Sequence, residues 1–256
     1  MSYEIPREAT LPFFSEPIAV HWDLHAASMV AIWLFLVPIA ILTIRYGKPR
    51  PVPHGIPRGT PNWSKLYFWW PVHFYLLYAA VGGTLAVGGF AILLSGGISG
   101  TLHSFFGLAT MTFAALQVVS AWYRGTHGGM RDPGADPANP ATWRGDHFDF
   151  TPRRRMFEAW HKSFGHFTAI MALGAITTGL AQFHLPGVTL YAVSSVAVIA
   201  GLVVLFEALG LRHDTYQSVY GNRINFPGNR KRALGSEPLD ILEAAERNGQ
   251  DNRPAL

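Results

Sequence analysis

Five long apolar stretches separated by polar segments dominate the pattern of the chain. They cover about residues 24–44, 68–94, 102–123, 160–182 and 187–210. Each has about the length of roughly 20 residues that an α-helix needs to cross a ~30 Å hydrocarbon core. Proline and glycine fall inside several of them, which is more common in membrane helices than in soluble ones. The pattern predicts an all-α integral membrane protein with five spanning helices.

Composition agrees with this class. Only 14% of the 256 residues are charged, whereas 49% are hydrophobic. A soluble domain usually carries about a quarter charged residues. The chain has no cysteine, which excludes disulfides, zinc–thiolate sites and iron–sulfur clusters. The first residues, MSYEIPREATLPFF, lack a basic region followed by an apolar core, so no cleavable signal peptide is expected.

Basic residues are concentrated in every second segment that flanks the five stretches, so they fall on one side of the membrane. The segments 45–67 and 124–158 and the tail after 211 hold nearly all of them, including Arg45, Lys48, Arg124, Arg154, Arg230 and Lys231. The opposite segments hold only Arg7. The positive-inside rule then places the N-terminus in the periplasm and the C-terminus in the cytoplasm. The net charge of +4 reflects this asymmetry, and no nucleic-acid partner is predicted.

The spans and loops divide the chain into four parts. We predict a periplasmic arm at 1–23, a four-helix core at 24–183, a fifth spanning helix at 184–211 and a cytoplasmic tail at 212–256. The stretch SEPLDILEAAERNG in the tail predicts a short amphipathic helix that docks a partner or lies on the membrane. The loop 124–155 is rich in Gly, Pro and Asp, which is typical of irregular structure.

The eleven histidines differ in where they lie. His54, His127, His147 and His213 lie in polar segments, where solvation is expected. Four others each open a predicted core helix. His25 and His103 stand a similar number of residues before the inner ends of their helices, so they share an outer level. His73 and His161 each stand about one turn into a helix that starts from inside, so they share an inner level.

Two levels of facing histidines predict two flat cofactors. Haem iron accepts an imidazole on each side of its ring, and two histidine ligands leave no open position for oxygen. Gly107 and Gly165 each follow a histidine by four residues on the same helix face. Either these glycines let a macrocycle lie close to the backbone, or they only allow close helix packing. Both interpretations stay open at this point.

Two further histidines are reserve ligands. His166 is five positions from His161, roughly 140° around the helix, so both cannot face one partner. His21 lies one turn before His25 and is its weaker substitute. A single histidine at a membrane interface is more often a capping or lipid-level residue than a ligand, but four at paired depths are harder to explain that way.

The chain resembles the cytochrome b561 superfamily over about residues 25–182. The resemblance lies in HAASMVAIWLFLVPIAILTIRYGK, LYFWWPVHFYLLY, LHSFFGLATMTFAALQVVSAWYRG and RRRMFEAWHKSFGHF. It is similar to the membrane core found beside DOMON domains and in ferric-reductase-like proteins, although many members have six spans. The resemblance implies two haem b groups, one ligated by His25 and His103 and the other by His73 and His161. It also implies a bacterial inner-membrane protein.

The function expected from these features is transmembrane electron transfer between a carrier on one face, with a quinol as candidate, and an acceptor or donor on the other. Quinone reductase and ferric reductase are the candidate enzymatic activities. The expected partners are the lipid bilayer and a quinone or soluble redox protein, with a homodimer or a larger redox complex open. The alternatives are a haem-bearing anchor subunit of a larger oxidoreductase and a haem-free transporter or scaffold whose histidines relay protons or bind metal.

Overall fold

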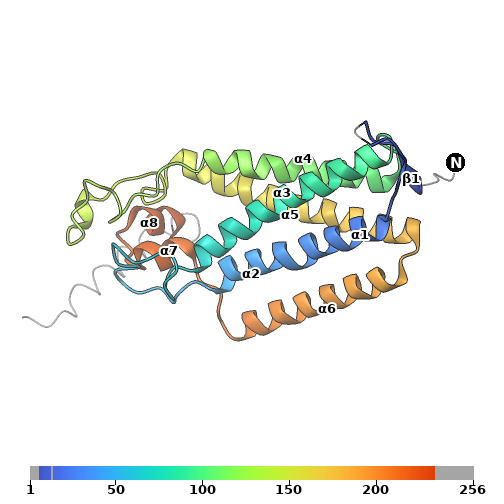
Figure 1. Ribbon diagram of the computed structural model, residues 1–256. Coiled ribbons are helices and arrows are strands. Elements are labelled where there is room, and N and C mark those ends of the chain that lie inside the picture. The colour runs from blue at the N-terminus through green and yellow to red at the C-terminus, as the bar shows by residue number, and fades with distance from the viewer. Residues whose placement is uncertain (1–5, 13, 234–256) are drawn as a thin grey trace, which may run out of the picture.

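The computed structural model describes residues 6–12 and 14–233, and five long helices dominate it (Figure 1). The first span is continuous through α1 (Trp22–Ala31), the π-helical segment η1 (Ile32–Leu36) and α2 (Val37–Tyr46). The others are α3 (Trp69–Leu94), α4 (Leu102–Trp122), α5 (Pro152–Phe183) and α6 (Pro186–Ala208). All five are long and apolar enough to cross a membrane. The prediction of a helical, multi-pass membrane protein is confirmed.

The first four spans form a closed ring of contacts. α4 packs most extensively on α5, α2 packs on α3, α3 packs on α4, and α1 contacts both α3 and α5. The first span and α4 are therefore diagonal across the ring, as are α3 and α5. α6 lies outside the ring against the first span (Figure 1), where Ala192 packs with Val30 and Leu34. The interior between the four helices is the place where side chains from diagonal helices can meet.

Local signals explain where the core helices begin. Thr101 accepts a hydrogen bond from the backbone N–H of Ser104 and caps α4, and Thr151 does the same for α5 through Arg154. Pro152 then occupies the first turn of α5, where its missing N–H costs nothing. The helix begins at Pro152 rather than at 160 because this cap precedes the apolar run. Its first turns, with their arginines, extend beyond the apolar segment.

The first span changes its hydrogen-bond pattern in the middle. Residues Ile32–Leu36 are π-helical, and Pro38 follows directly in α2. Proline has no N–H to donate to the carbonyl four residues earlier, here that of Leu34. A π-helical turn is one way to accommodate this defect without breaking the helix. The defect lies between His25 and the C-terminal end of the span.

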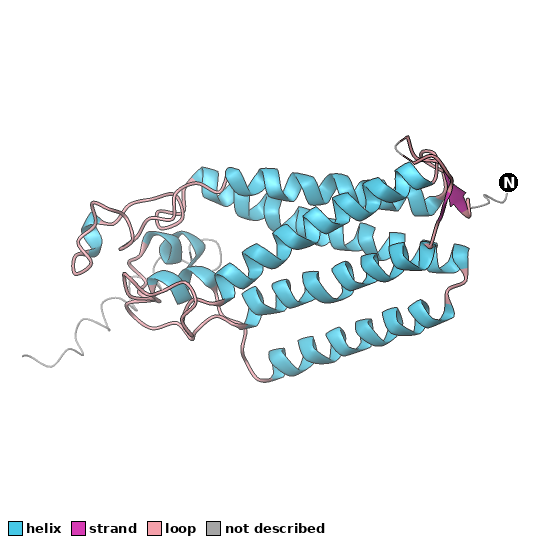
Figure 2. Cartoon of the chain, viewed as in Figure 1, coloured by secondary structure: helices cyan, strands magenta, loops and turns pink. Residues whose placement is uncertain are grey.

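The smaller elements lie at the two ends of the bundle. Strands β1 (Glu8–Ala9) and β2 (Ile18–Ala19) pair antiparallel before α1. The 3₁₀ turn η2 (Pro140–Thr142) and helices α7 (Thr215–Tyr220) and α8 (Pro227–Ala233) lie at the opposite end, among the longer loops (Figure 2). The basic segments that flank the spans are at this second end.

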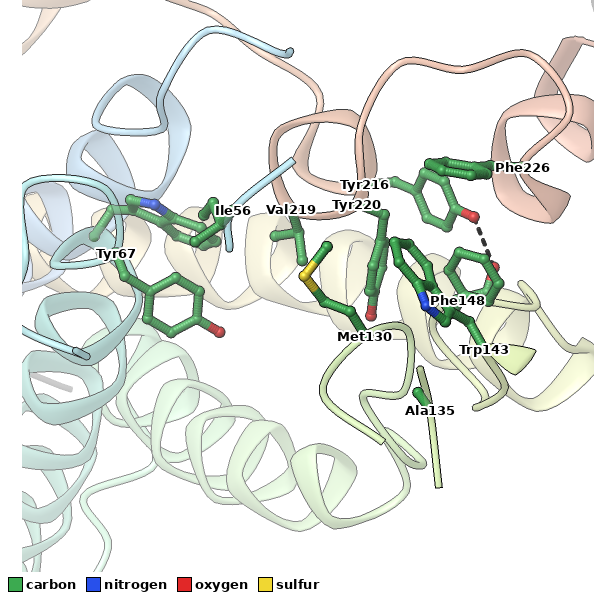
Figure 3. Packing of buried hydrophobic residues seen from close by; sticks show 11 residues of the cluster. Ile56, Tyr67, Met130, Ala135, Trp143, Phe148, Tyr216, Val219, Tyr220 and Phe226 are labelled. Atoms are coloured by element: carbon green, nitrogen blue, oxygen red, sulfur yellow. Dashed lines mark hydrogen bonds between the residues drawn. The ribbon is translucent and has the colours of Figure 1, made fainter. Parts of the chain in front are cut away.

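Three loops that are far apart in sequence pack together at the basic end. We call this cluster of buried apolar residues the aromatic cap (Figure 3); it consists of Ile56, Tyr67, Trp69, Met130, Ala135, Trp143, Phe148, Tyr216, Val219, Tyr220 and Phe226. The Tyr216 hydroxyl donates to the carbonyl of Phe148 at 2.8 Å and accepts from the N–H of Gly228 at 2.9 Å. The predicted irregular loop is irregular only up to Thr151, apart from η2, because residues from Pro152 on belong to α5; this loop packs against the rest of the chain.

The aromatic cap corrects one prediction about the histidines. His147 is only 3% exposed, and its Nε2 lies 3.9 Å from Oε1 of Glu158. His127 packs against both His147 and Tyr220, and its Nε2 is buried. Solvation of these two histidines was therefore the wrong expectation, since residues from distant segments cover them. His54 is exposed as expected. The predicted amphipathic helix of the tail lies outside the described residues.

Candidate functional site

A cavity lies between the four core helices near the end that carries the N-terminal arm. Its volume is about 240 Å³, and its lining includes His25 and Trp33 from the first span, His103 and Gly107 from α4, and Gly179 from α5. No Asp, Glu, Lys or Arg is among its lining residues, all of which the structure describes. A mostly apolar cavity with a few converging polar groups is the usual form of a small-molecule or cofactor site.

His25 and His103 face one another across this cavity. Their ring centres are 6.1 Å apart, and the ring planes are nearly perpendicular at 89°. Nδ1 of His103 is 2.9 Å from the carbonyl oxygen of Ala175 on α5. Such a bond fixes the neutral ring with its proton on Nδ1 and leaves Nε2 free as an acceptor or metal ligand. The structure thus brings together the two histidines that the sequence assigned to the outer level.

His25 is held less firmly than His103. Its Nδ1 is buried without a hydrogen bond of ordinary geometry, although the Val87 carbonyl on α3 is near enough to interact with it. Trp22, one turn earlier, packs its ring edge-on against His25 with centres 6.2 Å apart. The ring is positioned by packing rather than by a strong polar contact.

The inner pair consists of His73 on α3 and His161 on α5. Nδ1 of His73 is 3.2 Å from the carbonyl oxygen of Ala40 on α2, the same kind of contact that His103 makes. His161 stacks on Phe157 with ring centres 5.1 Å apart, and its Nδ1 is buried without a partner. His73 and His161 lie on the diagonal helices α3 and α5. Each pair therefore joins diagonal helices and contains one histidine anchored to a backbone carbonyl.

The glycines near the histidines divide into two kinds. A Cβ at Gly107 would meet no neighbouring atom within 4 Å, and at Gly165 it would meet only Nε2 of Gln117, at 4.0 Å. Close helix packing does not explain Gly107, and the one atom near a Cβ at Gly165 is the end of the Gln117 side chain rather than a helix backbone. At Gly179, by contrast, a Cβ would come 2.8 Å from Nδ1 of His103. Gly179 lets the His103 ring lie against α5 and reach the Ala175 carbonyl.

The reserve histidines do not join either pair. His21 is exposed and precedes α1 without a side-chain capping bond. His166 is exposed, and its Nδ1 lies 2.7 Å from the carbonyl of Lys162 in its own helix.

Three further residues belong to the candidate site. Gly179 makes room for His103, whereas Trp33 Nε1 and Gln117 Nε2 are buried polar atoms without partners. Trp33 lines the outer cavity, and Gln117 lies beside Gly165 near the inner pair. Their importance depends on contacts between helices, and no local motif marks them.

The residues present fit a haem better than a metal ion held by protein alone. Among the described residues no group of three or more His, Cys, Asp or Glu side chains could hold a metal. A bare zinc site needs at least three protein ligands, whereas a haem iron needs only two axial ones because its ring supplies the rest. Each pair of histidines has the number of ligands that a haem iron needs, and the outer pair also borders a cavity.

Comparisons with family models, with curated proteins and with solved structures found no match.

Proposed function

We propose that the protein carries electrons across a membrane through two b-type haems, one between His25 and His103 and the other between His73 and His161. The observation that carries the proposal is the 6.1 Å separation of the His25 and His103 ring centres. Metal–nitrogen bonds of about 2 Å on both sides of one iron put two imidazole centres roughly 6 Å apart. The outer pair thus has the spacing that one shared iron requires.

Haem supplies one-electron chemistry at the iron, and the protein sets its ligands and surroundings. The carbonyls of Ala175 and Ala40 accept hydrogen bonds from Nδ1 of His103 and His73, which orients these rings and leaves Nε2 of each without that contact. Gly107 and Gly165 leave room beside the histidines. The cavity has no charged lining residue, so it disfavours water and competing reactions there.

The proposed carriers follow from the membrane setting. A quinol or quinone reaches the spans from lipid, and a soluble redox protein reaches either end. We propose a bacterial inner membrane with the basic end in the cytoplasm, as the distribution of Lys and Arg indicates. Quinone and ferric reduction are the candidate activities.

A second role is supported by the aromatic cap. The cap is the buried core of a folded region that presents its own surface beyond the spans, and its residues come from three loops, the last of which includes α7. A haem-bearing anchor subunit that docks a larger oxidoreductase would use such a surface. Co-purification of a catalytic subunit with the chromosomally tagged chain would favour this role over an independent carrier.

A spectrum with a haem count tests the proposal. The full chain is produced under haem-replete conditions and purified in a neutral detergent. We expect a b-type α-band in the reduced-minus-oxidised spectrum and two haems per chain by the pyridine haemochrome assay. His166→Ala is a control variant that should retain both haems, because His166 is exposed and joins neither pair. A wild-type protein without an α-band would contradict the proposal and favour a haem-free transporter or scaffold.

A further inference from the structure

A second hollow, distinct from the histidine pairs, lies at the basic end beside the aromatic cap. We call it the arginine pocket. Its volume is about 520 Å³, and it is lined by Asn62, Tyr67, Trp70, Arg124, Gly125, Thr126, His127, Gly128, Arg131, Asp132 and Pro133. Trp70 belongs to the first turn of α3, and Arg124 follows the end of α4 at Trp122. The pocket therefore lies where two spans end, at the level expected for the membrane interface.

Aromatic rings, rather than carboxylates, hold the two arginines of the pocket. The guanidinium carbon of Arg124 lies 4.9 Å from the Trp70 ring centre, and that of Arg131 lies 4.2 Å from the Tyr67 ring centre. Within the described part of the chain neither arginine has a carboxylate at ion-pair distance. A guanidinium that stacks on a ring keeps its N–H donors available in the ring plane.

Asp132 is the acidic residue of the pocket, and its carboxylate contacts a backbone N–H rather than Arg124 or Arg131. Its Oδ1 accepts a hydrogen bond from the backbone N–H of Gly134 at 3.0 Å. The carboxylate is used to shape its own turn, and it does not neutralise Arg124 or Arg131 by direct contact. The pocket keeps a net positive potential.

Two buried polar atoms of the pocket residues lack partners. They are Nη2 of Arg131 and Nε2 of His127. Burial and the nearby charges of Arg131, Arg124 and Arg154 lower the pKa of His127 to about 3, so its ring is neutral at pH 7. A neutral imidazole can still donate one hydrogen bond. Buried donors without partners are costly, and a bound acceptor would remove that cost.

We propose that the arginine pocket binds an oxyanion group, a phosphate or a carboxylate, through Arg131, Arg124 and His127. Charge-assisted hydrogen bonds from a guanidinium to such oxygens are among the strongest that proteins make. The group has two sources at this depth, the head group of an anionic lipid and a free anion from solution. A lipid source is favoured because basic and aromatic side chains at the interface commonly contact phosphate head groups.

Inorganic phosphate is the first probe. The full-length protein, delipidated in a neutral detergent, is titrated calorimetrically with phosphate at constant ionic strength. We expect saturable binding that Arg131→Gln weakens roughly tenfold or more, since one charged donor is lost. Arg155→Gln is the matched control, because Arg155 is exposed in the first turn of α5, outside the pocket, and the change in charge is the same. Arg124→Gln is the second variant if Arg131→Gln fails to fold.

Two further measurements identify whether a lipid head group or a free anion supplies the oxyanion group. If lipid supplies the group, native mass spectrometry of gently purified protein shows a retained phosphatidylglycerol that Arg131→Gln loses and Arg155→Gln keeps. If a free anion supplies it, phosphate binds equally before and after delipidation. Phosphate binding only after haem removal would assign the pocket to the carboxylates of a haem at the inner pair, an outcome that depends on the proposed function. Equal behaviour of the Arg131→Gln and Arg155→Gln proteins in all these measurements would overturn the proposal.

Discussion

Gly179 is the residue where one added methyl group should disturb the outer pair most directly. A Cβ there would come 2.8 Å from His103 Nδ1, closer than normal packing allows, while the ring is held by Ala175 on the same helix. We expect Gly179→Ala to displace His103 and to lower the haem content from two per chain toward one. Gly201→Ala in α6 is the control, because nothing lies within 4 Å of its new Cβ. The pyridine haemochrome assay measures both; two full haems in Gly179→Ala would contradict the assigned role of His103.

His127 makes stability depend on pH. Its pKa is about 3 in the folded chain and near 6.5 when unfolded, because burial and three arginines oppose protonation. Below pH 6.5 the unfolded chain therefore binds a proton that the folded chain does not. The contribution of His127 to the free energy of unfolding is therefore greatest above pH 6.5. It falls by at most about 1.4 kcal/mol per pH unit between pH 6.5 and pH 3.

Limited proteolysis of the 124–151 loop at pH 7.5 and pH 5 measures this effect. We expect cleavage to accelerate at pH 5 in the wild type. The rate should change less with pH in His127→Gln, because the glutamine side chain at position 127 does not titrate. The comparison uses the pH effect within each protein, since the substitution also changes stability on its own. The same acceleration in both proteins would exclude His127 as the cause.

The sequence predicted residues of the histidine pairs better than it predicted the residues around them. His25 and His103 are at matching positions in apolar segments, and their helix directions are enough to place them at one level. Gly107 was open to two interpretations, and the absence of any contact at its Cβ position disfavours close packing. His127 and His147 were expected to be solvated, but Tyr216 and Tyr220, about 70 to 90 positions later, cover them. Local sequence carries no signal of such contacts.

The π-helical segment of the first span sets the direction of His25 relative to the inner half of that span. One extra residue in a helical turn rotates everything before it by about 100° relative to a regular α-helix. Pro38 favours the defect because it cannot donate to Leu34. We expect Pro38→Ala to allow a regular helix, to turn His25 away from His103 and to weaken outer haem binding.

Haem retention during gel filtration measures this weakening. Ile39→Ala is the control, since Ile39 lies on the same helix, its side chain is 47% exposed, and the substitution removes no backbone constraint. Loss of haem in Pro38→Ala, with retention in Ile39→Ala, supports a role of the π-helical segment in the site. Equal retention would mean that the segment is only a local accommodation of proline.

At the scale of elements, the positions of the spans were predictable, whereas their caps and irregularities were not. The observed spans α3 and α4 agree with the predicted ranges within one residue at each end, because lipid requires a continuous apolar helix of fixed length. α5 begins earlier because Thr151 and Pro152 start the helix outside the apolar segment. The π-helical segment has no apolar signature of its own, and periodicity alone does not detect it.

The whole molecule places its basic loops at one end and its short loops and N-terminal arm at the other (Figure 1). The aromatic cap at the basic end combines three loops and therefore follows from the tertiary fold alone.

Since the chain has no cysteine, single cysteines can report the orientation of the chain in the membrane. Ile98 and Val52 are exposed at opposite ends, at 62% and 49%.

We expect Ile98→Cys to react with a membrane-impermeant maleimide in intact spheroplasts, and Val52→Cys to react only after the membrane is opened. This follows from the excess of Lys and Arg in the loops on the Val52 side. The reverse labelling pattern would refute the predicted orientation while leaving the histidine pairs unaffected.

Haem counts in two double variants test the central claim most directly, because the claim concerns which histidines share an iron. His25→Ala/His103→Ala removes both ligands of one proposed haem, whereas His25→Ala/His73→Ala removes one ligand from each. We expect one haem per chain in the first variant and none bound stably in the second. Equal haem content in the two variants, with both folded by circular dichroism, would contradict the pairing and with it the path proposed for electrons.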